Sequence, residues 1–310
     1  MKKNTVAILM ATYNGEKFIS QQLESILAQK EVDVHLYVSD DASNDNTVEI
    51  IKDFSSRYPE NFKKIFNVEF RSPSKNFLSL FAKVPETYDY YAFSDQDDVW
   101  FENKLKNSIN KINDGYDLYC GRTENVNQDL VTFGYSPLFN NKPIFRNALV
   151  QSIAGANTMV FNNKIFNLVR PSFNLNSPMH DWWIYILTTF ADYKVYYDPV
   201  PQLFYRQHQN NFNGSNTGIR NLFKRIINGF KGEYKKNNNL NEKNILEFID
   251  YGTKQNLKIF YQFQNLRKNS SIFNFENKDF SRVGVYRQTL LGNIMLKLSL
   301  ILKITLIDIK

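Results

Sequence analysis

The chain has 310 residues, of which 43% are hydrophobic and 22% are charged, and this size favours one main domain with a smaller appended region. Its 26 Phe and 18 Tyr exclude an intrinsically disordered protein, and only 12 Gly and 9 Pro exclude a collagen-like or linker-type sequence. The single cysteine, Cys120, excludes an internal disulfide and a thiolate zinc cluster. We therefore expect a protein of the cytoplasm.

The net charge of +7 is unevenly distributed. From Ile219 onward there are 17 basic and 7 acidic residues, whereas the first 218 residues hold 21 basic and 24 acidic ones. An acidic front part and a basic rear part indicate different binding partners. The beginning Met1-Lys2-Lys3 lacks the pattern of a secretory signal, and no apolar stretch is long and uninterrupted enough to predict a membrane-spanning helix.

The hydrophobic pattern alternates between strands and helices. The apolar run from Val6 to Ala11 is typical of a strand buried on both faces, and Phe18 to Gln29 follows with helical spacing. Further strands are predicted at 34–39, 65–70, 90–94, 118–120, 158–161 and 195–197, and further helices around 50–54, 76–83, 105–112 and 180–187. This order predicts a doubly wound α/β domain, and the Asn/Gly/Ser-rich stretch 210–218 suggests that it ends near residue 215.

Polar residues follow the first, second and fourth predicted strands, where ligands bind in such sheets. They are Thr12-Tyr13-Asn14, Asp40-Asp41, and Asp95-Gln96-Asp97-Asp98. Glycine-based phosphate loops are absent from the sequence, so a bound diphosphate needs another source of positive charge. The closely spaced carboxylates of the third group favour a divalent cation, Mg²⁺ or Mn²⁺, over a solvated acidic turn.

Asp40 and Asp41 allow two interpretations. One of them caps the following helix together with Ser43, or one accepts a hydrogen bond from the imide N–H of a pyrimidine base at the edge of the sheet. Both interpretations can hold, with one residue for each.

Five sequence motifs together resemble family 2 glycosyltransferases of the GT-A fold. They are Ala11-Thr12-Tyr13-Asn14-Gly15, Val38-Ser39-Asp40-Asp41-Ala42-Ser43, Ser94-Asp95-Gln96-Asp97-Asp98-Val99-Trp100, His180-Asp181-Trp182-Trp183 and Tyr205-Arg206-Gln207-His208. Their order and spacing also match, over about residues 5 to 210. The third and fourth motifs are most similar to rhamnosyltransferase-like members that build bacterial surface polysaccharides.

The resemblance implies roles for individual residues. In that family the first acid of the DxD-type motif, here Asp95, contacts the donor ribose, and the second, Asp97, binds the metal. His208 helps to bind metal or diphosphate, with Arg206 nearby as a phosphate partner. Asp181 occupies the position of the general base, and it is preceded by His180 where many relatives have Glu.

Four further residues carry open alternatives. Asp98 is a third potential ligand of the cation, and His180 is either a site residue or a structural histidine. Trp182 packs the helix against the sheet, stacks on a sugar, or does both. Gly155 allows close approach of an acceptor sugar, or only kinks a strand.

The carboxy-terminal region, residues 216–310, has a helical and basic character. In the stretch from Leu290 to Ile309 the polar residues Asn293, Lys297, Lys303 and Asp308 fall within an arc of about 140°, which leaves a broad apolar face. Upstream basic residues are Arg220, Lys224, Arg225, Lys231, Lys235 and Lys236. The pattern predicts either docking on an anionic membrane, at the inner face of the cell membrane, or packing on the catalytic domain or on a second protomer.

The sequence thus predicts an inverting, metal-dependent glycosyltransferase that uses a pyrimidine nucleotide sugar, dTDP-rhamnose first and a UDP-hexose second. The expected acceptor is a glycan or a lipid-linked sugar rather than a nucleic acid. Two alternatives are a metal-dependent phosphohydrolase centred on Asp95, Asp97, Asp98 and His208, and a catalytically silent scaffold of an assembly complex. An inverting displacement needs one carboxylate as base and not the carboxylate pair of a glycosidase.

Overall fold

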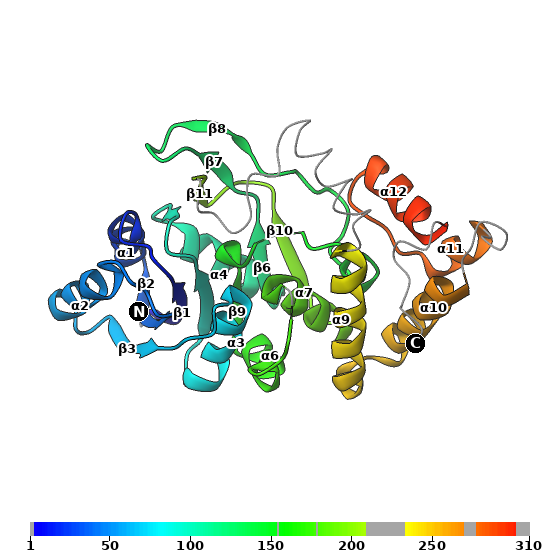
Figure 1. Ribbon diagram of the computed structural model, residues 1–310, viewed down its shortest axis with the longest axis horizontal. Helices are drawn as coiled ribbons and strands as arrows, with labels where there is room; N and C mark the ends of the chain where they lie inside the picture. Colours follow the sequence, from blue (N-terminus) through cyan, green and yellow to red (C-terminus); the bar gives the residue numbers. More distant parts are fainter. Residues whose placement is uncertain (1–2, 154, 178, 209–232, 270–276, 302–310) are drawn as a thin grey trace. The chain divides into compact units, whose positions relative to one another are not determined.

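The structure is a computed structural model that describes residues 3–153, 155–177, 179–208, 233–269 and 277–301. The chain forms two compact units (Figure 1). The first unit contains residues 1–138, 154–175 and 195–215, and the second contains residues 139–153, 176–194 and 216–310. The expected division at residues 215–216, with a catalytic role before it and a docking or packing role after it, stays a prediction.

The first unit is an α/β domain whose elements alternate along the chain. Its elements are β1 (Asn4–Thr12), α1 (Ile19–Leu27), β2 (Val32–Asp40), α2 (Thr47–Arg57), β3 (Phe62–Asn67), α3 (Pro73–Lys83), β4 (Tyr90–Ser94), β5 (Val99–Trp100), α4 (Lys104–Asn113), β6 (Leu118–Gly121), β7 (Glu124–Val126), β8 (Thr132–Tyr135), η1 (Ala156–Thr158), β9 (Val160–Asn162), α6 (Asn163–Val169), η2 (Arg170–Ser172), β10 (Val195–Asp198) and β11 (Leu203–Arg206).

The main sheet has seven strands in the order β10-β6-β9-β4-β1-β2-β3. Strands β3, β2, β1 and β4 are parallel neighbours, as the doubly wound pattern predicted, and β9 is antiparallel to both β4 and β6. A second sheet of four strands has the order β5-β11-β7-β8. The prediction of an α/β domain is therefore confirmed, and its main sheet is mixed.

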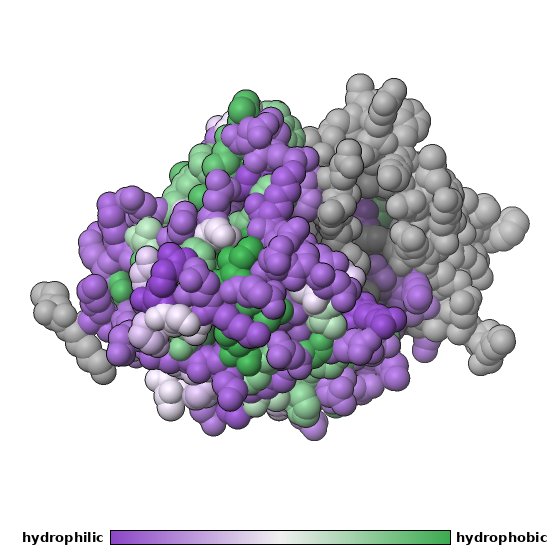
Figure 2. Space-filling view, turned by 60° about the vertical axis from the view of Figure 1, so that its left-hand side comes forward, coloured by the Kyte–Doolittle hydropathy of each residue, from purple (hydrophilic) through white to green (hydrophobic). Residues whose placement is uncertain are grey.

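Apolar side chains fill both faces of the main sheet because its central strands are buried. On one face, Val6, Ile8 and Met10 of β1 pack with the apolar stripes of α1, α2 and α4. The other face is aromatic, with the rings of Tyr91 and Phe166 stacked at 3.9 Å between centroids. On the face of the molecule seen in Figure 2, hydrophilic residues predominate and hydrophobic ones gather in small groups.

One strand differs from the prediction in its position. The sequence pattern placed the third strand at 65–70, whereas β3 covers Phe62–Asn67. The backbone N–H groups of Phe70, Arg71 and Ser72 donate to the carboxylate of Asp41 instead of pairing in the sheet. The apolar residue Phe70 therefore belongs to a loop, which is organised by a side chain distant in sequence.

The second unit is helical in the part that the structure describes. Its elements are α5 (Phe145–Ala148), α7 (His180–Phe190), α9 (Glu233–Glu247), η3 (Ile249–Tyr251), α10 (Lys254–Asn269), α11 (Asn277–Val283) and α12 (Leu290–Ile301). Helix α7 is its centre, since all of its residues except His180 are buried. Phe190 at its end contacts the rings of Phe145 and Phe260.

No helix within the described ranges is long and apolar enough to cross a membrane. The basic residues Arg220, Lys224, Arg225 and Lys231 of the predicted tail lie outside the described residues, as do Lys303 and Asp308.

The packing of Gly252 against Phe190 gives a test of the second unit. A Cβ atom added at Gly252 would lie 2.2 Å from Cζ of the Phe190 ring, whose position its aromatic neighbours restrict. The backbone φ of Gly252 is −78°, so alanine itself fits the local conformation. We expect Gly252→Ala to lower the free energy of unfolding by about 1–3 kcal/mol through overpacking, measured by urea denaturation.

Gly134→Ala is the matched control, because an added Cβ there meets no atom within 4 Å. Its effect should stay within about 0.5 kcal/mol. Equal free energies of unfolding for the two variants would contradict this prediction, because they would show that the Phe190 ring moves aside without loss of stability.

Candidate functional site

The three polar motifs of the first unit lie at neighbouring strand ends. In the register of the main sheet, Thr12 of β1 lies opposite Asp40 of β2, and Met10 of β1 lies opposite Ser94 of β4. The residues after these strands therefore meet at the carboxyl edge of the sheet, as parallel strands require. The structure brings together the motifs that begin at Thr12, Asp40 and Asp95.

Asp40 and Asp41 hold the loops at this edge. The carboxylate of Asp40 accepts hydrogen bonds from Thr12 Oγ1 at 2.7 Å, Ser43 Oγ at 2.6 Å and Ser43 N at 2.9 Å. The carboxylate of Asp41 accepts the three backbone N–H groups of residues 70–72. Neither caps helix α2, whose first N–H, that of Thr47, donates to Asp45 at 3.0 Å, so the capping interpretation was wrong.

The loop after β1 is fixed by Gln96, which the sequence interpretation had not assigned to the site. Its side-chain amide exchanges two hydrogen bonds of 2.8 Å with the backbone of Tyr13. Asn14 takes a left-handed φ of 47° and its N–H donates to Ser43 Oγ at 2.9 Å. Tyr13 is 54% exposed, so its ring is available to a ligand. The position of Gln96 between Asp95 and Asp97 was the feature of the sequence that could have pointed to a role for Gln96 in the site.

Asp98 is the buried residue of the Asp-rich motif. Its carboxyl group is 0% exposed and accepts hydrogen bonds from Asn157 Nδ2 at 2.6 Å and from the backbone N–H of Arg206 at 3.3 Å. Burial, followed by the charges of Asp97 and Asp95, raises the pKa of Asp98 well above its ordinary value. Asp98 therefore connects the loop after β4 with η1 and β11.

Arg206 is also inside the protein, at 1% exposure. Its Nε donates to the backbone oxygen of Asp97 at 2.9 Å, Nη2 donates to Gln21 Oε1 at 2.5 Å, and Nη1 donates to the backbone oxygen of Gln128. The guanidinium carbon also lies 4.6 Å from the ring centroid of Phe18. These contacts tie the loop of Asp97 to β11.

Asp97 and His208, the two predicted metal ligands, are in contact with each other. Asp97 Oδ2 lies 2.8 Å from Nε2 of His208, and both side chains are largely but not completely buried, at 15% and 11% exposure. The imidazole ring also packs on Phe18, with 4.8 Å between the centroids. Within the described residues no cluster of three or more His, Cys, Asp or Glu side chains is arranged as a metal site.

Two further predicted residues of this unit have defined surroundings. Asp95 is half-buried at the end of β4, where its backbone oxygen accepts a hydrogen bond from Ser94 Oγ at 2.8 Å. Gly155 precedes η1, and a Cβ added there would lie 2.7 Å from Oδ1 of Asn157, the residue that binds Asp98. Glycine at position 155 leaves room for that asparagine.

Lys104 is a buried cation close to the Asp-rich motif. Its side chain is 0% exposed, and Nζ lies 3.7 Å from the ring centroid of Trp100 with no hydrogen-bond acceptor among the described residues. Burial lowers the pKa of Lys104 to about 7, and the negative charge of Asp98 acts in the opposite direction. Nothing in the sequence distinguishes Lys104 from the other lysines of this amphipathic helix.

Asp181, His180 and Trp182 lie in the second unit, in the first turn of α7. Asp181 is 9% exposed, and one of its carboxylate oxygens accepts the N–H of Trp182 at 2.7 Å. Burial raises the pKa of Asp181 to about 6, and burial lowers the pKa of His180 to about 3, so His180 is neutral at physiological pH. Trp182 is 3% exposed and its indole N–H donates to the backbone oxygen of Ala148 at 2.7 Å, which makes it a packing residue.

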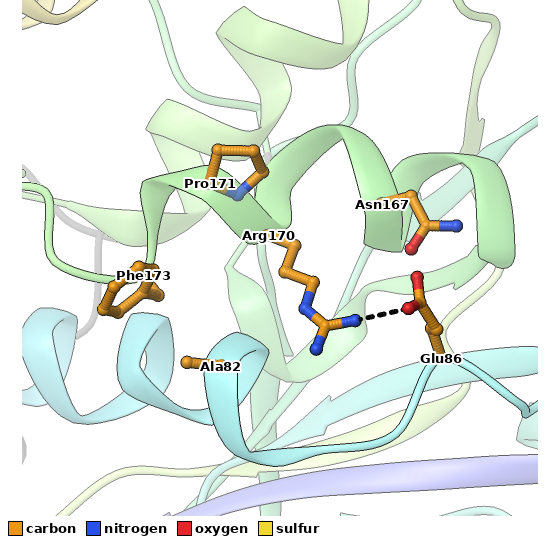
Figure 3. A pocket seen from close by; sticks show the side chains of 6 residues that line it. All are labelled: Ala82, Glu86, Asn167, Arg170, Pro171 and Phe173. Atoms are coloured by element: carbon orange, nitrogen blue, oxygen red, sulfur yellow. Dashed lines mark ion pairs between the residues drawn. The ribbon is translucent and has the colours of Figure 1, made fainter.

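A cavity of about 520 Å³ lies elsewhere on the first unit (Figure 3). It is lined by Ala82, Glu86, Asn167, Arg170, Pro171 and Phe173, and Arg170 forms an ion pair of 2.9 Å with Glu86. None of the predicted site residues lines it, so it is separate from the candidate site.

A doubly wound sheet with acidic and polar motifs at its carboxyl edge is the arrangement of a GT-A glycosyltransferase. The family model described as "Glycosyl transferase family 2" matches residues 7–168, and the chain belongs to this family. The protein "dTDP-rhamnosyl transferase RfbG" of Shigella flexneri is 34% identical over 234 residues, which cover 70% of this chain and 78% of that protein.

Solved structures share the fold at low sequence identity. S. aureus TarS 1-349 in complex with UDP-GlcNAc superposes with a TM-score of 0.57 at 15% identity, over 96% of this chain and 81% of that one. A mannosyltransferase from Pyrobaculum calidifontis in complex with GDP-Man and Mn2+ gives a TM-score of 0.51 at 12% identity, over 96% and 88% of the two chains. These similarities support the GT-A fold.

The buried Lys104 predicts how stability depends on pH. Its pKa in the folded state lies below the ordinary value of 10.5, so the unfolded chain binds more protons between about pH 7 and 10.5 and stability rises with pH across this range. Lys104→Met removes the cation and keeps the apolar stem. We expect the variant to be more stable than the wild type at pH 6, and the difference to shrink toward pH 9.5, measured by chemical denaturation at each pH.

Lys111→Met, which removes an exposed lysine from the same helix, should differ from the wild type by a small amount that does not change with pH. A constant difference for Lys104→Met as well would show that Lys104 keeps its ordinary proton affinity.

Proposed function

We propose that this family 2 glycosyltransferase transfers a sugar with inversion, in the assembly of a bacterial surface polysaccharide. The proposed donor is dTDP-rhamnose, with a UDP-hexose as the second choice, and the proposed acceptor is a glycan or a lipid-linked sugar. The relative named as a dTDP-rhamnosyl transferase supports the donor. The observation that carries the proposal is the pairing of Asp97 with His208 beside the loops of Asp40 and Asp41.

The residues present fit a divalent cation. Asp97 offers a carboxylate oxygen and His208 an imidazole nitrogen, both of which are ligands of Mn²⁺ and related ions, and the two atoms already lie side by side. Asp97 and His208 would hold the ion, which would supply positive charge to the leaving diphosphate. Tyr13, Asn14 and Asp95 are the proposed contacts of the nucleoside. Asp40 and Asp41, whose carboxylates accept hydrogen bonds inside the protein, are proposed to position the loops that carry these contacts.

Arg206 and Asp98 act on this site through other residues. Resemblance alone suggested Arg206 as a phosphate partner, but its guanidinium donors point at the backbone of Asp97 and Gln128 and at Gln21. We therefore assign to Arg206 the positioning of Asp97. Asp98, with both oxygens bonded inside the protein, is assigned the same kind of role rather than that of a ligand.

Asp181 is the proposed general base. In a single displacement the acceptor hydroxyl loses its proton as its oxygen attacks the anomeric carbon, and one carboxylate suffices to accept that proton. With a pKa of about 6, Asp181 is ionised at neutral pH. This pKa is also close enough to neutral pH for efficient proton transfer. Its position in the first turn of α7 places the anion near the positive end of the helix dipole.

Removal of Asp97 tests the donor site. We expect Asp97→Ala to abolish the Mn²⁺-dependent part of the affinity for UDP and dTDP, because the carboxylate that would hold the ion is lost. Isothermal titration calorimetry with and without Mn²⁺ measures this difference. Asp53→Ala, at an exposed position of α2, serves as control and should bind as the wild type does. Undiminished Mn²⁺ dependence in Asp97→Ala would refute the assignment.

Replacement of Asp181 tests the base. Asp181→Asn is nearly isosteric but cannot accept the proton, so transfer should fall by roughly 10²- to 10⁴-fold with nucleotide affinity almost unchanged. In the wild type the rate should also fall as the pH drops below about 6, where Asp181 becomes protonated, and this limb should be absent in the variant. The measurement is nucleotide release from dTDP-rhamnose and UDP-glucose, with and without an undecaprenyl-diphosphate-linked sugar as acceptor.

Asp192→Asn is the matched control in the same unit, because asparagine tolerates the left-handed φ of 64° found there. Its transfer rate should equal that of the wild type. A phosphohydrolase would release nucleotide without acceptor and would keep doing so in Asp181→Asn. Acceptor-dependent transfer at the wild-type rate in Asp181→Asn would exclude Asp181 as the base.

A further inference from the structure

Helix α12 of the second unit (red in Figure 1) has apolar residues on two opposite sides. Leu296 and Leu300 are buried, at 2% and 0% exposure. On the other side Leu290, Leu291, Ile294 and Leu298 are 80%, 50%, 48% and 44% exposed. Packing within the protein therefore explains the apolar residues on the side of Leu296 and Leu300 only.

The four exposed residues form one continuous surface. At about 100° per residue, Leu290, Leu291, Ile294 and Leu298 fall within an arc of about 100°, whereas Leu296 and Leu300 lie at about 240° to 280° from Leu290. We call these four residues the α12 stripe. Isolated exposed leucines need no explanation, but an aligned set along one helix is typical of an interaction surface.

Two segments that adjoin the α12 stripe, residues 139–153 and 280–301, carry basic residues and no acidic ones. Residues 139–153 are hydrogen-bonded to residues 286–288, the turn before α12, through Asn141 N to Gln288 Oε1 at 2.9 Å and Asn147 Nδ2 to the backbone oxygen of Tyr286 at 2.9 Å. Residues 139–153 and 280–301 together contain five basic residues and no Asp or Glu. The five, here called the basic set, are Lys142, Arg146, Arg282, Arg287 and Lys297.

From these observations we propose that the α12 stripe and the basic set dock this protein on an anionic lipid bilayer. The apolar stripe enters the boundary between headgroups and acyl chains, while the cations interact with the anionic headgroups. The 12 residues of α12 that the structure describes are about 18 Å long, against about 30 Å for the hydrocarbon core, and the proposal places them in the plane of the surface.

The positive charge of the basic set favours a bilayer over a second copy of the chain as the partner that covers the α12 stripe. A twofold dimer through this face would bring the basic sets of both copies into one interface. That arrangement brings like charges together without an acidic residue from either segment to compensate them. An anionic lipid surface supplies charge opposite to that of both segments.

The test is co-sedimentation of the full chain with vesicles, without nucleotide or acceptor. We expect binding to vesicles of phosphatidylglycerol and phosphatidylcholine at about 50 mM salt, and a loss of about tenfold or more at about 500 mM salt or with phosphatidylcholine alone. The double variant Leu291→Glu/Ile294→Glu should lose about tenfold or more. Lys142→Gln/Lys297→Gln should bind several-fold more weakly and lose part of the salt dependence.

Leu246→Glu, at a leucine of α9 that is 47% exposed, is the matched control and should bind as the wild type does. Nucleotide affinity by calorimetry should be the same in all these proteins, so the outcome is independent of the proposed glycosyl transfer. The proposal is overturned if the wild type ignores phosphatidylglycerol vesicles at low salt, or if Leu291→Glu/Ile294→Glu binds them undiminished. It is also overturned if these two substitutions convert a stable dimer into a monomer and vesicles bind neither form.

Discussion

The buried carboxyl group of Asp98 is the constraint on which the arrangement of the site depends. At zero exposure a carboxyl group needs hydrogen-bond donors from the protein, because water cannot reach it. Asn157 supplies one from η1, and the backbone of Arg206 supplies the other from β11. The loop after β4 is thereby joined to two segments that lie about 60 and 110 residues further along the chain.

The second, smaller sheet makes the same connection through its backbone. Strand β5, directly after the Asp-rich motif, pairs with β11, with Trp100 opposite Leu203. The pairing returns the chain to the motif so that Arg206 meets the backbone of Asp97 and His208 meets its side chain. Two strands of two and four residues thus determine whether the proposed metal ligands are neighbours.

Hydrogen bonds to side chains hold the polar loops at the carboxyl edge of the main sheet in a defined conformation. Asp40 and Asp41 each accept three donors, and Gln96 clamps the backbone of Tyr13. Asn14 and Ala42 adopt left-handed φ values of 47° and 58°, which cost free energy and persist only where surrounding contacts impose them. At the same edge the ring of Tyr13 stays exposed, while Gln96 holds the backbone of this residue.

The sequence by itself determined the alternation of strands and helices, the parallel core and the identity of the motifs, because apolar periodicity and strand-end polarity are local properties. It also predicted Asp97 and His208 as metal ligands, but it could not show that they touch, since 111 residues separate them. Only the tertiary structure decided that Asp98 and Arg206 face inward, that Asp41 ends β3 early, that Lys104 is a buried cation, and that α12 is apolar on two sides. Each of these depends on which distant segments supply hydrogen bonds or cover a side chain, and a local pattern carries no information about that.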